Sequence, residues 1–236
     1  TTRERTLASV PRDQDGFTLL EPVFMGRRYE QAQIRRSRHH QALLEGFEAL
    51  AWADQGDRPS SWRALKNEPS RARASARRLD ATLPVLRQAL DRPFFVVPSR
   101  WSEGPGATVP NYILMRRLAY GLRSRADLHE QEGDLSQALD IHLLNLRWCD
   151  RIAGQGPLIS GMIGVALDNV AQEGLLDFLR RNRLAEPDLR RVLQAQENRR
   201  LGFQSFLDNV DNEFAFGLGA SINRGRDVSE EDQRKG

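Results

Sequence analysis

Four histidines are the first residues of this chain to consider for metal binding or acid–base chemistry. His39 and His40 are adjacent, so on a helix their side chains point about 100° apart and cannot hold one ion together. His129 and His142 fall on two consecutive expected helices and would approach each other across a hairpin. No third ligand is spaced for zinc. We therefore predict a core histidine at position 142 with its hydrogen bonds satisfied, and no metal site.

The densest acidic cluster, Asp208, Asp211 and Glu213, is the second candidate for chemistry. Paired carboxylates can bind a cation or transfer protons. The opposite side of the same expected helix is apolar and carries Phe206, Val210 and Phe214. The glycine and terminal glutamate of a calcium-binding loop are missing. We expect a solvated helix face rather than a site.

Nucleophile and phosphate-loop motifs are not present in the sequence. Cys149 follows Trp148 on an expected packed helix and is interpreted as a small core residue. The sequence contains neither a Gly-x-Ser-x-Gly elbow nor a Gly-Lys-Ser or Gly-Lys-Thr phosphate loop. The sequence therefore predicts no catalytic residue and no cofactor, and an enzyme of unknown class is the last of the alternatives.

Two groups of arginines in the N-terminal half are the candidates for phosphate or partner contacts. They are Arg35, Arg36 and Arg38, and then Arg71, Arg73, Arg77 and Arg78. If these arginines have a binding function, we expect them to contact the phosphates of nucleic acid or of anionic lipid headgroups. The formal net charge is only +3, and no aromatic residues are interleaved for base stacking. We favour solvated helix faces, and nucleic acid is the less favoured partner.

The elements that must position these residues are expected to be helices within one domain. A chain of 236 residues with 39% hydrophobic residues can bury a sizeable core. We expect a flexible arm at 1–15, a single helical domain at 16–222 and a disordered tail at 223–236. The domain comprises an N-terminal helical part (16–92), a short extended connector (93–109) and C-terminal helical hairpins (110–222). The predicted fold class is all-α, an irregular helical bundle or an array of α-hairpins.

The clearest structural pattern is a helical hairpin turning at Gly133 and Asp134. Apolar residues at spacings of three and four precede the turn and follow it, which is typical of two packed helices. After the hairpin, residues 157–167 carry no charge, and Gly161 and Gly164 would let another helix approach closely. We expect this third helix to be surrounded on most sides. Pro84 predicts a kink or a restart in an earlier helix.

The segment from Glu130 to Leu139 resembles the turn and second-helix start of a tetratricopeptide repeat. Ala126 then occupies the small-residue position of the first helix, and Ala138 lets the second helix touch it. The chain departs from the repeat pattern at His142, Asn145 and Asp150, so the match covers about half of one repeat.

A broader resemblance extends over residues 79–207. It is carried by Leu90-Asp91-Arg92-Pro93, Trp101, Arg117-Leu118-Ala119, Gly133-Asp134 and Gly156-Pro157-Leu158-Ile159-Ser160. This order is similar to a group of uncharacterised bacterial helical-domain proteins that are abundant in planctomycetes and often carry an N-terminal hydrophobic anchor. The resemblance implies an envelope-facing helical domain and supplies no catalytic residues. The printed sequence has no apolar run of about 18 residues, so membrane attachment would require an anchor ahead of Thr1.

The architecture favours a non-catalytic scaffold or adaptor that binds another protein. Arginine-mediated binding to nucleic acid or membrane phosphates is the first alternative. In the leading interpretation the glycines of the hairpin and of the third helix serve packing, and the partner is held by helix faces.

Overall fold

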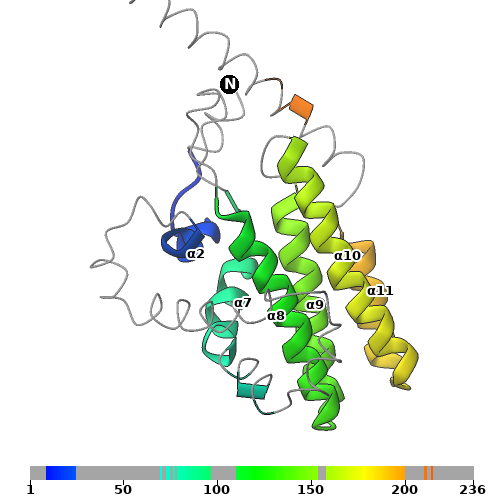
Figure 1. Cartoon of the computed structure of the whole chain (residues 1–236). Helices are drawn as coiled ribbons and strands as arrows, with labels where there is room; N and C mark the ends of the chain where they lie inside the picture. The colour runs from blue at the N-terminus through cyan, green and yellow to red at the C-terminus, as the bar shows by residue number, and fades with distance from the viewer. Residues whose placement is uncertain are drawn as a thin grey trace, which may run out of the picture.

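The computed structural model describes residues 9–24, 79–96, 110–153 and 158–199, together with residues 70, 73, 74, 77, 210, 211 and 214. This part of the chain is all-α, as predicted. Its elements are α2 (Phe17–Phe24), the 3-10 turn η2 (Leu79–Ala81), α7 (Leu83–Asp91), α8 (Tyr112–Gln131), α9 (Leu135–Ala153), α10 (Leu158–Arg181) and α11 (Glu186–Glu197). Helices α8, α9 and α10 run side by side, with α2 and α7 on one side and α11 on the other (Figure 1).

The predicted hairpin is formed by α8 and α9. Helix α8 begins where the side chain of Asn111 accepts a hydrogen bond from the Leu114 amide at 3.2 Å. It ends at Gln131, and Gly133 follows with a φ of 83°, the left-handed conformation that glycine adopts without steric cost. The Asp134 amide donates to the His129 carbonyl at 2.9 Å, and the Asp134 side chain accepts from the Gln137 amide at 3.1 Å. Asp134 therefore closes one helix and caps the next.

Replacing Gly133 with alanine should lower the free energy of unfolding by about 1 kcal/mol, because a side chain disfavours the left-handed region. A Cβ at this position meets nothing within 4 Å, so the cost is conformational rather than steric. Gly133→Asn is the matched control, since asparagine tolerates this conformation better, and it should recover part of the loss. Urea unfolding followed by circular dichroism measures both. An alanine variant as stable as the parent would contradict the assignment of the turn.

Two buried side-chain hydrogen bonds fix the register of the hairpin. The Asn145 amide donates to the Ala119 carbonyl at 3.0 Å, and the Trp148 indole donates to the Met115 carbonyl at 3.4 Å. In this antiparallel register Ala126 and Ala138 lie at the same level, and both are fully buried. Small residues at that level allow the two helices to approach closely near the turn.

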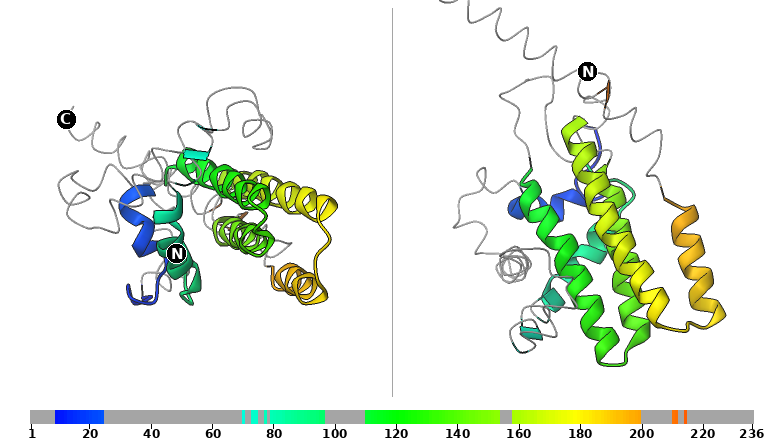
Figure 2. Two further views of the ribbon diagram at one scale, coloured as in Figure 1. Left: turned by 90° about the horizontal axis from the view of Figure 1, so that it is seen from below. Right: turned by 45° about the vertical axis from the view of Figure 1, so that its right-hand side comes forward.

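Helix α10 packs against both helices of the hairpin through one side only. On that side Gly161 and Gly164 are buried, and Gly164 lies directly against Ala153 of α9. On the other side Met162 and Val165 are 62% and 54% exposed. The expectation that this helix is surrounded on most sides was therefore wrong. Figure 2 shows α10 running alongside α8 and α9, and within residues 161–167 the uncharged run contributes both buried and exposed side chains.

The N-terminal elements dock onto the hairpin through aromatic side chains. Phe24 stacks on Trp148 of α9 with ring centroids 5.4 Å apart, and Phe95 meets the same indole edge-on at 6.0 Å. Residue Thr82 separates η2 from α7, with Pro84 in the first turn of α7, so the helix restarts there as the proline predicted. The packing joins α2, α7 and the hairpin in one core.

Residues 11–15, which we expected in a flexible arm, are packed against the segment that follows α7. The Asp15 carboxylate accepts hydrogen bonds from the amides of Phe17 at 3.0 Å and Val96 at 2.9 Å. Arg92 donates to the Asp15 carbonyl at 2.8 Å. Asp15 and Phe94 also form an isolated parallel bridge. Residues 1–8, residues 97–109 of the connector and the tail at 223–236 lie outside the described residues.

Candidate functional site

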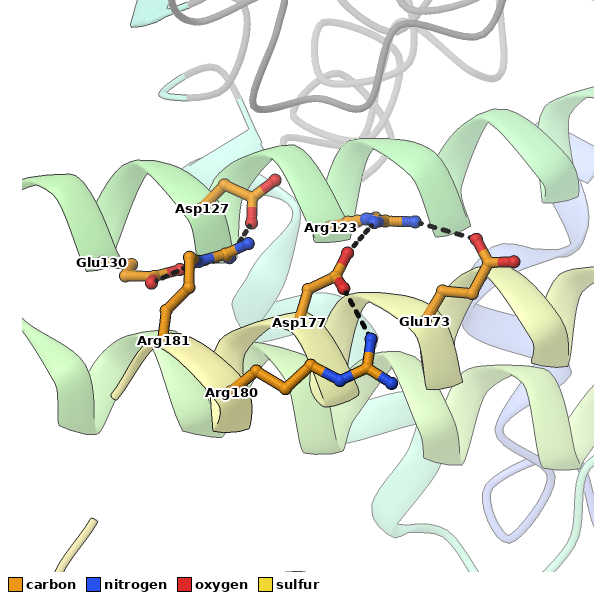
Figure 3. Close-up of polar contacts among 7 residues, drawn as sticks. All are labelled: Arg123, Asp127, Glu130, Glu173, Asp177, Arg180 and Arg181. Carbon is orange, nitrogen blue, oxygen red and sulfur yellow. Dashed lines mark hydrogen bonds and ion pairs between the residues drawn. The ribbon is translucent and has the colours of Figure 1, made fainter. Parts of the chain in front are cut away.

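A line of ion pairs joins α8 to α10 along one edge of the bundle (Figure 3). At one end of this line, Arg181 donates to Glu130 at 2.7 Å and lies 3.4 Å from Asp127. The two carboxylate side chains are only 6% and 4% exposed. Burial by itself would raise the pKa of Glu130, but hydrogen bonds from Arg181 and Asn182 outweigh it and hold the pKa below its ordinary value. These contacts keep the buried Glu130 carboxylate charged and paired.

The other end of the line is more open to solvent. Arg123 donates to Asp177 at 2.9 Å and lies 3.5 Å from Glu173, while Arg180 lies 3.5 Å from Asp177. The side chains of Glu173 and Arg180 are 71% and 75% exposed. Exposed pairs of this kind contribute little to stability. The arrangement holds α10 in register on α8, and it leaves Glu173 and Arg180 accessible at the surface.

His142 lies in the core between α8, α9 and α10. Its side chain packs on Phe178 with centroids 5.2 Å apart and lies beside Gly174. The residue is 1% exposed, and within the described part of the chain neither ring nitrogen has a hydrogen-bond partner. The predicted core position is correct, but the predicted hydrogen bonds are missing among the described residues.

Burial is the main reason why the pKa of His142 falls to about 4, with the nearby Arg123 and Arg181 also lowering it and Glu130 opposing them. His129 lies elsewhere, with its Nδ1 3.9 Å from an Asp134 carboxylate oxygen. In the register of the hairpin the two histidines are about two helical turns apart. They do not form a shared site, and no group of three metal-binding side chains occurs among the described residues.

The remaining candidates for chemistry are placed as follows. Cys149 is fully buried, and burial raises the pKa of its thiol far above the ordinary value, so the thiolate is disfavoured. Asp211 is exposed, while Asp208 and Glu213 lie outside the described residues, as do His39 and His40. Val210 and Phe214 are 40% and 70% exposed, so the apolar side expected opposite the acidic cluster is not covered at these two positions.

Of the seven candidate arginines, the structure describes Arg73 and Arg77. Arg77 donates to Glu132 at 2.9 Å. This hydrogen bond is the main reason why the pKa of Glu132 is lowered. The other five, Arg35, Arg36, Arg38, Arg71 and Arg78, lie outside the described residues. The contact with Glu132 compensates the charge of Arg77, which reduces its pull on a phosphate.

Exposed apolar side chains gather on α10 and α11, and we call this set the α10–α11 face. Five of the large apolar residues exposed in the described structure belong to it: Met162 (62%), Val165 (54%), Leu176 (47%), Leu189 (44%) and Leu193 (63%). Many leucines of the core are almost completely buried instead, among them Leu118, Leu122 and Leu175. An exposed set of this size on two neighbouring helices is typical of a contact surface.

Helix α11 is held in place by contacts on either side of the buried Val192. Arg191 pairs with Asp140 of α9. Gln196 donates to Gln172 of α10 at 3.4 Å, and Arg199 pairs with Asp168. Gln196 contacts Gln172, and the later residue Arg199 contacts the earlier residue Asp168, so α10 and α11 are antiparallel.

This register brings the leucines of the α10–α11 face together. Leu176 lies one turn beyond Gln172, and Leu193 lies almost one turn before Gln196, so the two leucines stand at nearly the same level. Leu189, one turn before Leu193, continues the surface along α11. The sequence did not show that α9 and α10 leave these flanks uncovered.

The described structure is thus an all-α domain with a line of ion pairs between α8 and α10 and an exposed apolar surface, the α10–α11 face. No family model matches the chain, and neither a curated protein nor a solved structure shows significant similarity to it. None of the described helices combines the length and the apolar character needed to cross a bilayer. The tetratricopeptide and planctomycete resemblances therefore stay predictions from the sequence.

Proposed function

We propose that this protein is a non-catalytic helical scaffold or adaptor that binds a protein partner through the α10–α11 face. The observation that carries the proposal is the exposure of Leu176 and Leu193, at 47% and 63% of their surface, at nearly the same level of two antiparallel helices. Burying such side chains in a contact removes apolar surface from water, which is the main favourable term in protein association.

The rest of the described structure is compatible with a rigid support for this surface. Helix α10 is fixed to α8 by the ion pairs of Arg123 and Arg181, and α11 is fixed to α9 and α10 by Arg191 and Arg199. A surface presented on rigid helices loses little conformational entropy on binding. The described arginine contacts do not favour the phosphate-binding alternative, since Arg77 is engaged by Glu132.

Replacing Leu176 and Leu193 together with glutamate should lower partner binding at least about tenfold, because two charges would have to be buried at the centre of the contact. The tagged chain is purified from cells of its source organism, and co-purifying proteins are quantified by mass spectrometry. Binding of each recovered protein to the purified chain is then measured directly.

Ile113→Glu is the matched control, because Ile113 is 56% exposed and lies on α8, away from the face. Both variants should unfold within about 1 kcal/mol of the parent, since surface substitutions have small effects on stability. Equal recovery of every protein partner with the parent and the double glutamate variant would refute the proposal.

A further inference from the structure

We infer that the protein partner of the α10–α11 face is a second copy of this chain, packed with its α10 antiparallel to the first. This inference rests on the proposed function and names its partner. It is argued from the order of charged and apolar side chains along the outer side of α10.

Three exposed residues carry the charge complementarity. Glu173 lies three residues before Leu176 and Arg180 lies four residues after it, so all three share one side of the helix. Glu173 is 71% exposed and Arg180 is 75% exposed, and each keeps its partner within the chain at 3.5 Å. In chain order, the outer side of α10 therefore carries an acidic residue, a leucine and a basic residue.

A two-fold axis through Leu176 converts this order into a self-complementary contact. Antiparallel pairing places Leu176 against its own copy, and it places Glu173 opposite the partner copy's arginine at both ends. In the parallel arrangement like charges would meet instead. The order of the side chains thus favours one orientation of one partner.

Helix α11 adds to the same contact. Leu193 stands level with Leu176, and Leu189 follows it, so an antiparallel pair of copies would bring two α10 and two α11 helices together around these leucines. In the direction of α10, the acidic Glu197 comes before the basic Arg190 on α11, because α11 runs antiparallel to α10. Arg190 already pairs with Glu186 at 2.6 Å, so the test below uses Glu173 and Arg180.

The first experiment is sedimentation equilibrium of the purified full chain over a wide range of concentrations. A dimer of about twice the chain mass of 26.8 kDa is expected. The double variant Leu176→Glu and Leu193→Glu should be monomeric, and Ile113→Glu should dimerise like the parent.

The second experiment tests the antiparallel register with two single variants. Glu173→Arg leaves only bases on either side of Leu176, and Arg180→Glu leaves only acids, so each variant alone should dimerise roughly tenfold more weakly or worse. Mixing the two variants pairs base with acid at both ends and should restore a heterodimer of parental affinity. Circular dichroism of each variant should match that of the parent, because both side chains are exposed.

A dimer whose affinity is unchanged by the single variants, or a mixture that stays monomeric, would overturn this inference. A monomeric chain that captures a different protein through Leu176 and Leu193 would also overturn it, while the proposed function would stand. A monomeric chain whose captured proteins do not depend on these leucines would refute both.

Discussion

Replacing Gly164 with leucine should lower the free energy of unfolding by at least about 3 kcal/mol. A Cβ on Gly164 would stand 2.7 Å from the Ala153 Cα and 2.9 Å from its Cβ. Backbone atoms cannot give way by changing rotamer, so α10 would have to move off α9. That movement would loosen the packing between two helices that share the core residues Leu167 and Ile152. Urea unfolding of parent and variant measures the loss.

Val165→Leu is the control for this prediction. It adds bulk at the neighbouring position of the same helix, but Val165 is 54% exposed and points away from α9. Its stability should stay within about 0.5 kcal/mol of the parent. If Gly164→Leu unfolds at the same urea concentration as Val165→Leu, the close approach of α9 and α10 is wrong.

The second large effect is a dependence of stability on pH that originates at His142. Its pKa is about 4 in the folded chain against an ordinary value of 6.5, so the unfolded chain binds this proton more readily. The stability that comes from keeping His142 neutral is fully present above pH 6.5 and is lost as the pH falls towards 4. The loss over this window should be roughly 3 kcal/mol.

His142→Leu isolates this contribution. The variant should be at least as stable as the parent at pH 7, because it removes two buried nitrogens that lack partners, and it should lose about 3 kcal/mol less on acidification. The pKa values of Asp15 and Asp168 are raised, mainly by burial, which works in the opposite direction but is common to both proteins. Urea unfolding at pH 7 and pH 4 gives the comparison.

His129→Gln is the matched control for His142→Leu. The pKa of His129 is also lowered by burial, but its side chain is 15% exposed, so its variant should change the pH dependence less. If the stability of His142→Leu falls with acid as steeply as that of the parent, the buried neutral histidine is not the cause.

The hairpin and the class of fold were accessible from the sequence because their signals are local. The left-handed turn at Gly133, the capping side chain of Asp134 and the spacing of Ala126 and Ala138 each depend on residues within a few positions of one another. Local backbone preferences and helical periodicity are enough to specify such a unit. The same signals predicted a kink or a restart at Pro84, and the structure has a new helix, α7, beginning at Leu83.

The α10–α11 face could not be predicted from such local signals. The uncharged run at 157–167 predicted a helix covered on most sides, yet Met162 and Val165 are exposed. Periodicity shows that a helix has an apolar side, but it does not show how many neighbours cover that side. The burial of Asp15 could not be predicted from the sequence either, because it depends on contacts with Val96 and Arg92, which lie far along the chain.

By itself, then, the sequence determined an all-α chain, the turn at Gly133 and the need for close packing at Gly164, since each follows from the preferences of neighbouring residues. Only the tertiary structure decided that His142 is buried with no hydrogen-bond partner among the described residues, and that Leu176 and Leu193 are both exposed at nearly the same level. Both depend on which helix packs where. A histidine is satisfied or left unpaired by side chains from other helices, and a leucine is covered or exposed according to whether another element reaches it.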